Sequence, residues 1–213
     1  TGWAKVGGTW YYLSGSGAMQ TGWLSKGGSW YWLDPESGRM ATGWAKAADG
    51  KWYYFEGSGA MRSGGWMKQG SSWYYLSGSG AMQTGWLSKG GSWYWLDPDS
   101  GAMATGWEKA SDGKGYYFEG SGAMQSSRWL KQGTAWYYLS GSGAMQTGWL
   151  LTGGAWYWMD PESGMMATGW LENGGSWYYL DPSSGAMATG TAVIDGTRYI
   201  FDDSGACADF VDE

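Results

Sequence analysis

The chain has 213 residues, of which 13 are basic and 19 acidic, and its formal net charge of −6 is spread along the sequence. Without a basic groove it lacks the phosphate attraction that dominates nucleic-acid affinity, so no nucleic-acid partner is expected. No run approaches the roughly 18 apolar residues that cross a bilayer, so membrane insertion is not expected either.

Aromatic residues and glycine dominate the composition. The chain contains 41 Gly, 20 Trp and 16 Tyr. Ile and Val are confined to Ile194, Ile200, Val6, Val193 and Val211. We therefore expect aromatic rings to build the core as well as any binding surface. A single cysteine excludes an internal disulfide framework.

The first predicted element is a β-hairpin that begins at the N-terminal Thr-Gly-Trp. Its second strand is the run Trp-Tyr-Tyr-Leu at residues 10–13, which has a strong strand preference. Between the strands, Gly7-Gly8 suits the positive φ angles of a tight hairpin turn. So much glycine, without a 3.6-residue apolar period, argues against a helix.

This unit recurs along the whole chain. A tryptophan recurs every 20 to 22 residues, preceded by Gly except at Trp129, which follows Arg128, and a methionine closes each unit at intervals of 21 residues. The tryptophans are Trp3, Trp23, Trp44, Trp66, Trp86, Trp107, Trp129, Trp149 and Trp170. The methionines are Met19, Met40, Met61, Met82, Met103, Met124, Met145, Met166 and Met187, and Cys207 takes the corresponding place in the last unit.

A longer period of 63 residues overlies the short one, since Trp3, Trp66 and Trp129 begin three near-copies. This period indicates either a superhelix with about three hairpins per turn or the duplication of a three-repeat block. Because an isolated hairpin is marginal in water, each unit must bury its aromatic face against its neighbours. The sequence therefore predicts an all-β solenoid of stacked hairpins.

The last unit departs from the others. Thr191 replaces the Gly-Trp tryptophan, Arg198-Tyr199-Ile200 replaces Trp-Tyr-Tyr, and the end is acidic at Asp209, Asp212 and Glu213. We predict nine aromatic repeats over residues 1–188 and a divergent C-terminal capping hairpin over residues 189–213.

The spacing of the aromatics predicts concave sites. Side chains alternate faces along a strand, so Trp10 and Tyr12 point one way and Tyr11 the other. Trp10 and Tyr12 can therefore meet Trp3 across the hairpin. Indole faces at an angle, with a ring from the next hairpin and a methionine sulfur, suit a quaternary ammonium, which donates no conventional hydrogen bond.

The run T-G-W-x-x-x-x-G-x-W-Y-Y-L-x-x-x-G-x-M recurs at residues 21–40 and 84–103 with Trp for the second Tyr and one extra loop residue, and it resembles the choline-binding repeat of bacterial cell-wall-attachment modules. The resemblance covers essentially the whole chain. It implies a left-handed superhelix of hairpins in which two tryptophans of one hairpin and an aromatic of the next hold the choline of teichoic acids. It also implies an extracellular module, attached non-covalently to the cell wall.

Carried onto this sequence, the resemblance implies seven complete boxes. They are Trp3, Trp10, Trp32 and Met40; Trp23, Trp30, Tyr54 and Met61; Trp44, Trp52, Tyr75 and Met82; Trp66, Trp73, Trp95 and Met103; Trp86, Trp93, Tyr117 and Met124; Trp129, Trp136, Trp158 and Met166; and Trp149, Trp156, Tyr179 and Met187. The neighbouring aromatic of the same run is the alternative third wall.

Two further boxes are expected to be weak or empty. Gly115 replaces the second tryptophan beside Trp107, and Ile200 replaces the expected third aromatic opposite Trp170 and Trp177.

Each feature also has a structural interpretation. The middle tyrosine of each run, such as Tyr11 or Tyr74, is expected in the core, and each methionine is also a simple gap filler between hairpins. The recurring lysines are expected to form a solvated face, and the Asp-Pro pairs to form turns.

No metal site and no cofactor are expected, because the loops lack clustered oxygen ligands. Without histidine, and with carboxylates scattered in turns, catalysis is not expected.

The sequence thus predicts a non-catalytic module that holds choline groups by avidity. The alternative is a glucan-binding module that stacks sugars on the same rings, although the repeat supplies few polar groups to fix hydroxyls. A stalk that presents another domain is a third hypothesis. Self-association is left open.

Overall fold

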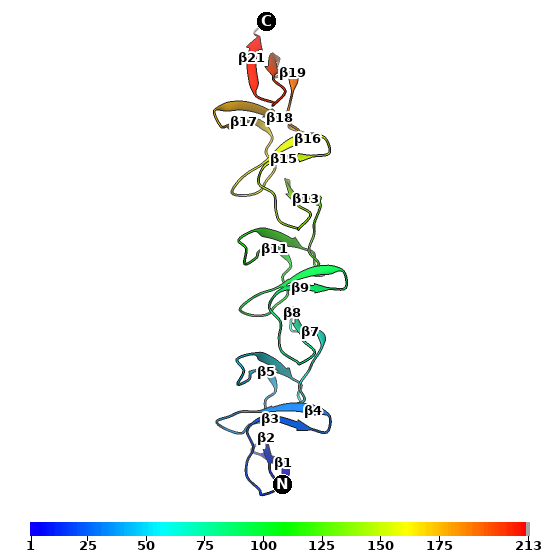
Figure 1. The fold of residues 1–213 in the computed structure, drawn as a ribbon, viewed down its shortest axis with the longest axis vertical. Coiled ribbons are helices and arrows are strands. Elements are labelled where there is room, and N and C mark those ends of the chain that lie inside the picture. The colour runs from blue at the N-terminus through cyan, green and yellow to red at the C-terminus, as the bar shows by residue number, and fades with distance from the viewer. Residues whose placement is uncertain (212–213) are drawn as a thin grey trace. The chain divides into compact units, whose positions relative to one another are not determined.

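A computed structural model describes the backbone of residues 1–211 and the side chains of residues 1–208, and over this range it contains strands and loops without any helix (Figure 1). The predicted acidic end at Asp209, Asp212 and Glu213 lies outside the described side chains. The described residues form two compact units, Thr1–Thr105 and Gly106–Glu213.

The first unit consists of antiparallel hairpins that follow one another along the chain. Its strands are β1 (Gly2–Val6), β2 (Thr9–Leu13), β3 (Gly22–Lys26), β4 (Ser29–Leu33), β5 (Gly43–Lys46), β6 (Trp52–Phe55), β7 (Gly65–Gln69), β8 (Ser72–Leu76), β9 (Gly85–Lys89) and β10 (Ser92–Leu96).

The second unit continues the pattern and ends in a three-stranded sheet of order β19-β20-β21. Its strands are β11 (Gly106–Lys109), β12 (Gly115–Phe118), β13 (Arg128–Gln132), β14 (Ala135–Leu139), β15 (Gly148–Thr152), β16 (Ala155–Met159), β17 (Gly169–Asn173), β18 (Ser176–Leu180), β19 (Gly190–Ile194), β20 (Thr197–Phe201) and β21 (Cys207–Val211). The predicted all-β succession of hairpins is confirmed, whereas the left-handed winding and the capping role of residues 189–213 stay predictions.

The hairpin turns have the chemistry that the sequence predicts. Val6 pairs with Thr9, so the turn consists of Gly7 and Gly8 alone. Their φ angles are 57° and 87°. Positive φ at both positions is the signature of a type I′ turn, whose twist matches that of the flanking strands. This turn fixes the register of the hairpin, and so it decides which aromatics share a face.

Consecutive hairpins within a unit are joined through the loop that ends in methionine. The Met166 amide donates a 2.8 Å hydrogen bond to the carbonyl of Trp136 in the preceding hairpin, and the Ala167 amide donates to the carbonyl of Trp158 in its own. The same bond joins Met40 to Trp10, Met61 to Trp30, Met82 to Trp52, Met103 to Trp73, Met145 to Gly115 and Met187 to Trp156. The methionine is therefore held against the second tryptophan of the hairpin before it.

The core contains both aromatic and aliphatic side chains. The residue that follows each aromatic run is at most 2% exposed at Leu33, Phe55, Leu76, Leu96, Phe118, Leu139, Met159, Leu180 and Phe201. The second tryptophan of each pair is instead 37–49% exposed at Trp10, Trp30, Trp52, Trp73, Trp93, Trp136, Trp156 and Trp177. Aromatic rings thus build part of the core, as expected, at Trp32, Tyr53, Phe55, Trp95, Tyr116, Phe118 and Phe201. The Leu, Phe or Met that ends each run takes the innermost place and leaves the second indoles outside.

Candidate functional site

The box built on β13 and β14 shows how each site is formed. Trp129 pairs with Tyr138 and Trp136 pairs with Lys131, so the two tryptophans are diagonal neighbours on one face of the hairpin. Their ring centroids lie 6.4 Å apart and their planes stand 89° apart. Two perpendicular indoles therefore form an open corner.

The next hairpin closes this corner. Tyr157, on β16, lies 4.9 Å from Trp129 between ring centroids, at 68° between planes. Met166 lines the fourth side, and Ser183 and Ser184 form part of the rim. The result is a cavity of about 300 Å³ with three aromatic faces and a thioether.

The same geometry recurs within both units. A cavity of about 240 Å³ is lined by Trp44, Trp52, Tyr74 and Met82, and one of about 260 Å³ by Trp149, Trp156, Tyr178 and Met187. The first tryptophan lies 4.8–5.0 Å from the tyrosine of the next hairpin in Trp3–Tyr31, Trp23–Tyr53, Trp44–Tyr74, Trp66–Tyr94, Trp149–Tyr178 and Trp170–Tyr199.

The third wall differs by one residue from the boxes that the sequence implies. Trp158, expected beside Trp129, lies 5.1 Å from Trp149 in its own hairpin. The other expected third aromatics also pack inside their own hairpins, in the pairs Trp23–Trp32, Trp44–Tyr54, Trp66–Tyr75, Trp86–Trp95, Trp107–Tyr117 and Trp170–Tyr179. Because neighbouring strand residues face opposite ways, the middle tyrosine faces the preceding hairpin. The middle tyrosine is buried at Tyr53 and Tyr116, as expected, and it also lines the boxes, where the sequence offers it only as the alternative third wall.

The box expected around Trp86 and Trp93 stays a prediction. These two tryptophans lie 6.1 Å apart at 87° in the first unit. Tyr117 and Met124, which the sequence adds to them, belong to the second unit.

The two boxes expected to be damaged differ from each other. Ile200 pairs with Thr191, and Tyr199 supplies the ring 4.8 Å from Trp170. Three aromatics are therefore present at Trp170, and Ile200 leaves no gap in that wall. At Trp107, by contrast, Gly115 does leave one wall open.

Loop carboxylates give the boxes an anionic rim that the sequence patterns do not reveal. The hydroxyls of Ser183 and Ser184 both donate to Asp181, at 2.6 and 2.8 Å. These hydrogen bonds, with backbone amides of the same two serines, lower the pKa of Asp181 to about 2. Equivalent bonds lower the pKa of Asp202 behind Ser204 and of Asp97 behind Ser100, and both serines line boxes. Each of these ionised carboxylates is hydrogen-bonded to a serine that lines a box, and its negative charge favours a cationic ligand there.

Lysine side chains show that the exposed indoles accept a cation. The Lys131 ammonium lies 5.3 Å from the ring centroid of Trp136, within the range of cation–π attraction. Lys5 and Lys68 lie in the same way over Trp10 and Trp73. The predicted solvated lysine face is thus also a set of cation–π contacts at the rims.

The described residues contain no cluster of three or more His, Cys, Asp or Glu side chains that could hold a metal ion. In this same part of the chain no helix is long and apolar enough to span a membrane.

Comparison with known families agrees with this geometry. A profile described as the choline-binding repeat matches residues 1–42, 36–66, 63–106, 129–168 and 162–191. A second profile, for a cell wall binding repeat, matches residues 105–124. A search of curated protein sequences found no significant match.

Solved structures from Streptococcus pneumoniae are similar over nearly the whole chain. CbpJ of strain TIGR4 is 31% identical, with a TM-score of 0.62 over 97% of this chain and 93% of that one. Choline binding protein F, in the presence of a peptidoglycan analogue, is 30% identical, with a TM-score of 0.68 over 97% and 92%. The modular autolysin LytC is 28% identical, with a TM-score of 0.63, and the match covers all of this chain and 47% of LytC.

These repeats imply a cell-surface, cell-wall-associated location, and the domains they match are non-catalytic binding domains. The profiles cover well over half of the sequence, and the aromatic boxes recur at the period of the profile. The chain belongs to the choline-binding repeat family.

Proposed function

We propose that the Trp/Trp/Tyr/Met boxes each hold the trimethylammonium group of a choline carried by cell-wall teichoic acid. The main support is the box at Trp129 and Trp136, where two perpendicular indoles, Tyr157 and Met166 line a cavity of about 300 Å³. A trimethylammonium group costs less to desolvate than a lysine ammonium, and each ring attracts it by about 0.5–2 kcal/mol.

The site residues proposed for choline are therefore the two tryptophans of one hairpin with the tyrosine and methionine of the next. They are Trp3, Trp10, Tyr31 and Met40; Trp23, Trp30, Tyr53 and Met61; Trp44, Trp52, Tyr74 and Met82; Trp66, Trp73, Tyr94 and Met103; Trp129, Trp136, Tyr157 and Met166; and Trp149, Trp156, Tyr178 and Met187.

A single box of this kind has an affinity near 1 mM, or roughly −4 kcal/mol. Firm attachment then comes from the number of boxes, because each later contact with the same polymer is intramolecular. The module binds and does not catalyse, and it anchors whatever it is joined to at the wall without a covalent bond.

Retention on choline-agarose, compared with ethanolamine-agarose of equal ligand density, tests this function. Both resins present a hydroxyethyl ammonium, but only choline carries three methyl groups and lacks N–H donors. We expect retention on choline-agarose at physiological salt and elution by free choline. Equal retention on both resins, or elution by salt alone, would show simple charge attraction and contradict the proposal.

A further inference from the structure

The site beside Trp107 differs in size from the other boxes. Its cavity measures about 780 Å³, against about 240, 260 and 300 Å³ at the boxes of Trp44, Trp149 and Trp129. The extra space opens where Gly115 stands in place of the second tryptophan. Its volume lies within the roughly 300–1,000 Å³ of sites that enclose whole small molecules, and exceeds the need of a trimethylammonium head.

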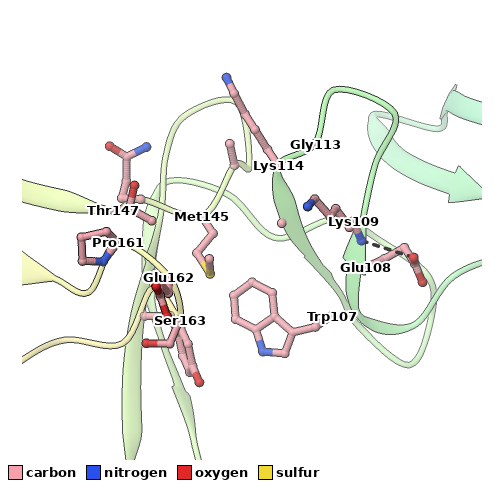
Figure 2. Close-up of a pocket in the computed structure, with 14 residues that line it drawn as sticks. Trp107, Glu108, Lys109, Gly113, Lys114, Met145, Thr147, Pro161, Glu162 and Ser163 are labelled. Carbon is pink, nitrogen blue, oxygen red and sulfur yellow. Dashed lines mark hydrogen bonds between the residues drawn. The ribbon is translucent and has the colours of Figure 1, made fainter.

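One strong aromatic surface remains in this cavity. The Trp107 ring lies 4.9 Å from Tyr137, and Met145 lines the cavity as the methionine does elsewhere. Figure 2 shows the Trp107 indole and the Met145 sulfur facing one another in the middle of the site. With the perpendicular indole missing, the ring offers a flat stacking face instead of an enclosing corner.

The rim carries more charged side chains than that of the other boxes. Glu108, Lys109 and Lys114 border the cavity on one side, and Thr147, Glu162 and Ser163 on the other (Figure 2). At the box of Trp129 the residue corresponding to Glu162 is Ser183. This cavity therefore has more charged hydrogen-bonding groups than the boxes at Trp44, Trp129 and Trp149.

The charged side chains of this lining add no net attraction for a cationic ligand. Two lysines and two glutamates border the cavity, so their formal charges cancel. Behind the rim, Asp160 accepts from the Ser163 hydroxyl at 2.6 Å, as Asp181 does from Ser183. What weakens cation binding here is the missing second indole, since the four charged side chains of the lining cancel. The same groups form charge-assisted hydrogen bonds to hydroxyls, which fix the rings of a neutral sugar.

We propose that this cavity is a saccharide site, in which Trp107 stacks on one ring of an uncharged oligosaccharide while Lys109, Glu162 and Ser163 bind its hydroxyls. The chain then combines boxes for a methylated cation with one site for a neutral glycan. This assignment does not depend on choline binding at the other boxes.

Methyl NMR of protein labelled with carbon-13 at the methionine methyl groups tests the proposal site by site. Met145 lines this cavity, whereas Met82, Met166 and Met187 each line a different box. Single Met→Leu variants assign the signals. The probes are chitotetraose and isomaltotetraose, both uncharged, and choline chloride. We expect at least one oligosaccharide to shift the Met145 signal selectively, and choline to shift Met166 at concentrations that leave Met145 unchanged.

Two variants separate a built site from an empty gap. A Cβ at Gly115 meets nothing closer than 3.7 Å, so Gly115→Trp fits the backbone and restores the second wall. It should abolish the oligosaccharide shift at Met145 and make that signal respond to choline. The double variant Lys109→Ala and Glu162→Ser removes one charged partner from each side of the cavity, and serine is the residue at the position of Glu162 in the next loop, at Ser183. It should weaken oligosaccharide binding about tenfold or more, because two charged hydrogen-bonding partners are lost.

The proposal is overturned if Met145 responds to choline as readily as Met166 does, or if neither oligosaccharide shifts it. Oligosaccharide shifts of equal size at all methionines would overturn it as well, because they would place glycan binding at the repeat in general. If choline failed to shift the Met166 signal, this result would count against the proposed choline binding alone, so the two outcomes are distinguishable.

Discussion

Trp129 and Trp136 stand almost perpendicular, 6.4 Å apart between ring centroids, although neither is the other's partner in the β-ladder. The two-residue turn sets the register of the hairpin, and this register places the two tryptophans as diagonal neighbours on one face. A flat stack of the same two rings would leave no hollow. The angle between them is therefore the feature that makes a repeat a site.

Trp136→Ala should remove one wall of this box without unfolding the chain, because Trp136 is 37% exposed and outside the core. The loss of one cation–π partner should weaken choline binding at this box by about 2- to 30-fold, equivalent to about 0.5–2 kcal/mol. The Met166 methyl signal reports on the box, and Met187 serves as the control because its box keeps Trp156. An unchanged midpoint at Met166 would count against the role of this indole.

Replacement of the third ring distinguishes the geometry found here from that implied by the sequence. Tyr157→Leu should weaken choline binding at Met166 and leave Met187 unaffected. Trp158→Leu should have the opposite pattern, because Trp158 packs on Trp149 of the next box. If Trp158→Leu were the variant that weakens binding at Met166, the assignment of the third wall to Tyr157 would be wrong.

Gly185→Ala should destabilise the fold near the same box. Gly185 has a φ of 75°, and a Cβ there would overlap the Met166 sulfur. Backbone strain of this kind costs about 1–3 kcal/mol, so the melting temperature should fall measurably. Ser183→Ala in the same loop is the matched control, and it should change the melting temperature less. A variant as stable as the parent would mean that the loop is free to move away from Met166.

Asp181 should make stability depend on pH in the acid range. Its pKa is lowered to about 2, below the value of an unfolded chain, so its stabilising effect is complete above about pH 4 and is lost as pH falls through 2. Asp181→Asn should therefore melt at a lower temperature than the parent at pH 6, and the difference should shrink towards pH 2. A difference that stayed constant from pH 6 to pH 2 would contradict this linkage.

The sequence predicts the hairpins well because their determinants are local. Gly7-Gly8 fixes the turn, and the run at residues 10–13 fixes the second strand. The first two walls of each box follow from the same register. The periodic methionine also predicts the fourth side, because every unit repeats the loop that places it.

The other parts of the site depend on how one hairpin stacks on the next, which no single repeat encodes. The choice between Tyr157 and Trp158 depends on which strand face meets the preceding hairpin. The rim residues Ser183 and Ser184 come from yet another hairpin along the chain, so their contribution is invisible in the local pattern. The size of the cavity at Gly115 likewise depends on the neighbouring loop that carries Glu162.

The most direct test of the cation boxes compares choline with 3,3-dimethylbutan-1-ol, its uncharged isostere, in methionine-methyl NMR titrations of the intact chain. The two molecules have the same shape, so they differ only in the charge that the aromatic faces and the loop carboxylates attract. We predict that choline shifts the Met82, Met166 and Met187 signals at millimolar concentration, whereas the alcohol requires at least about tenfold more. Equal responses to both molecules would show that the boxes bind by shape and apolar burial alone, and would contradict the account.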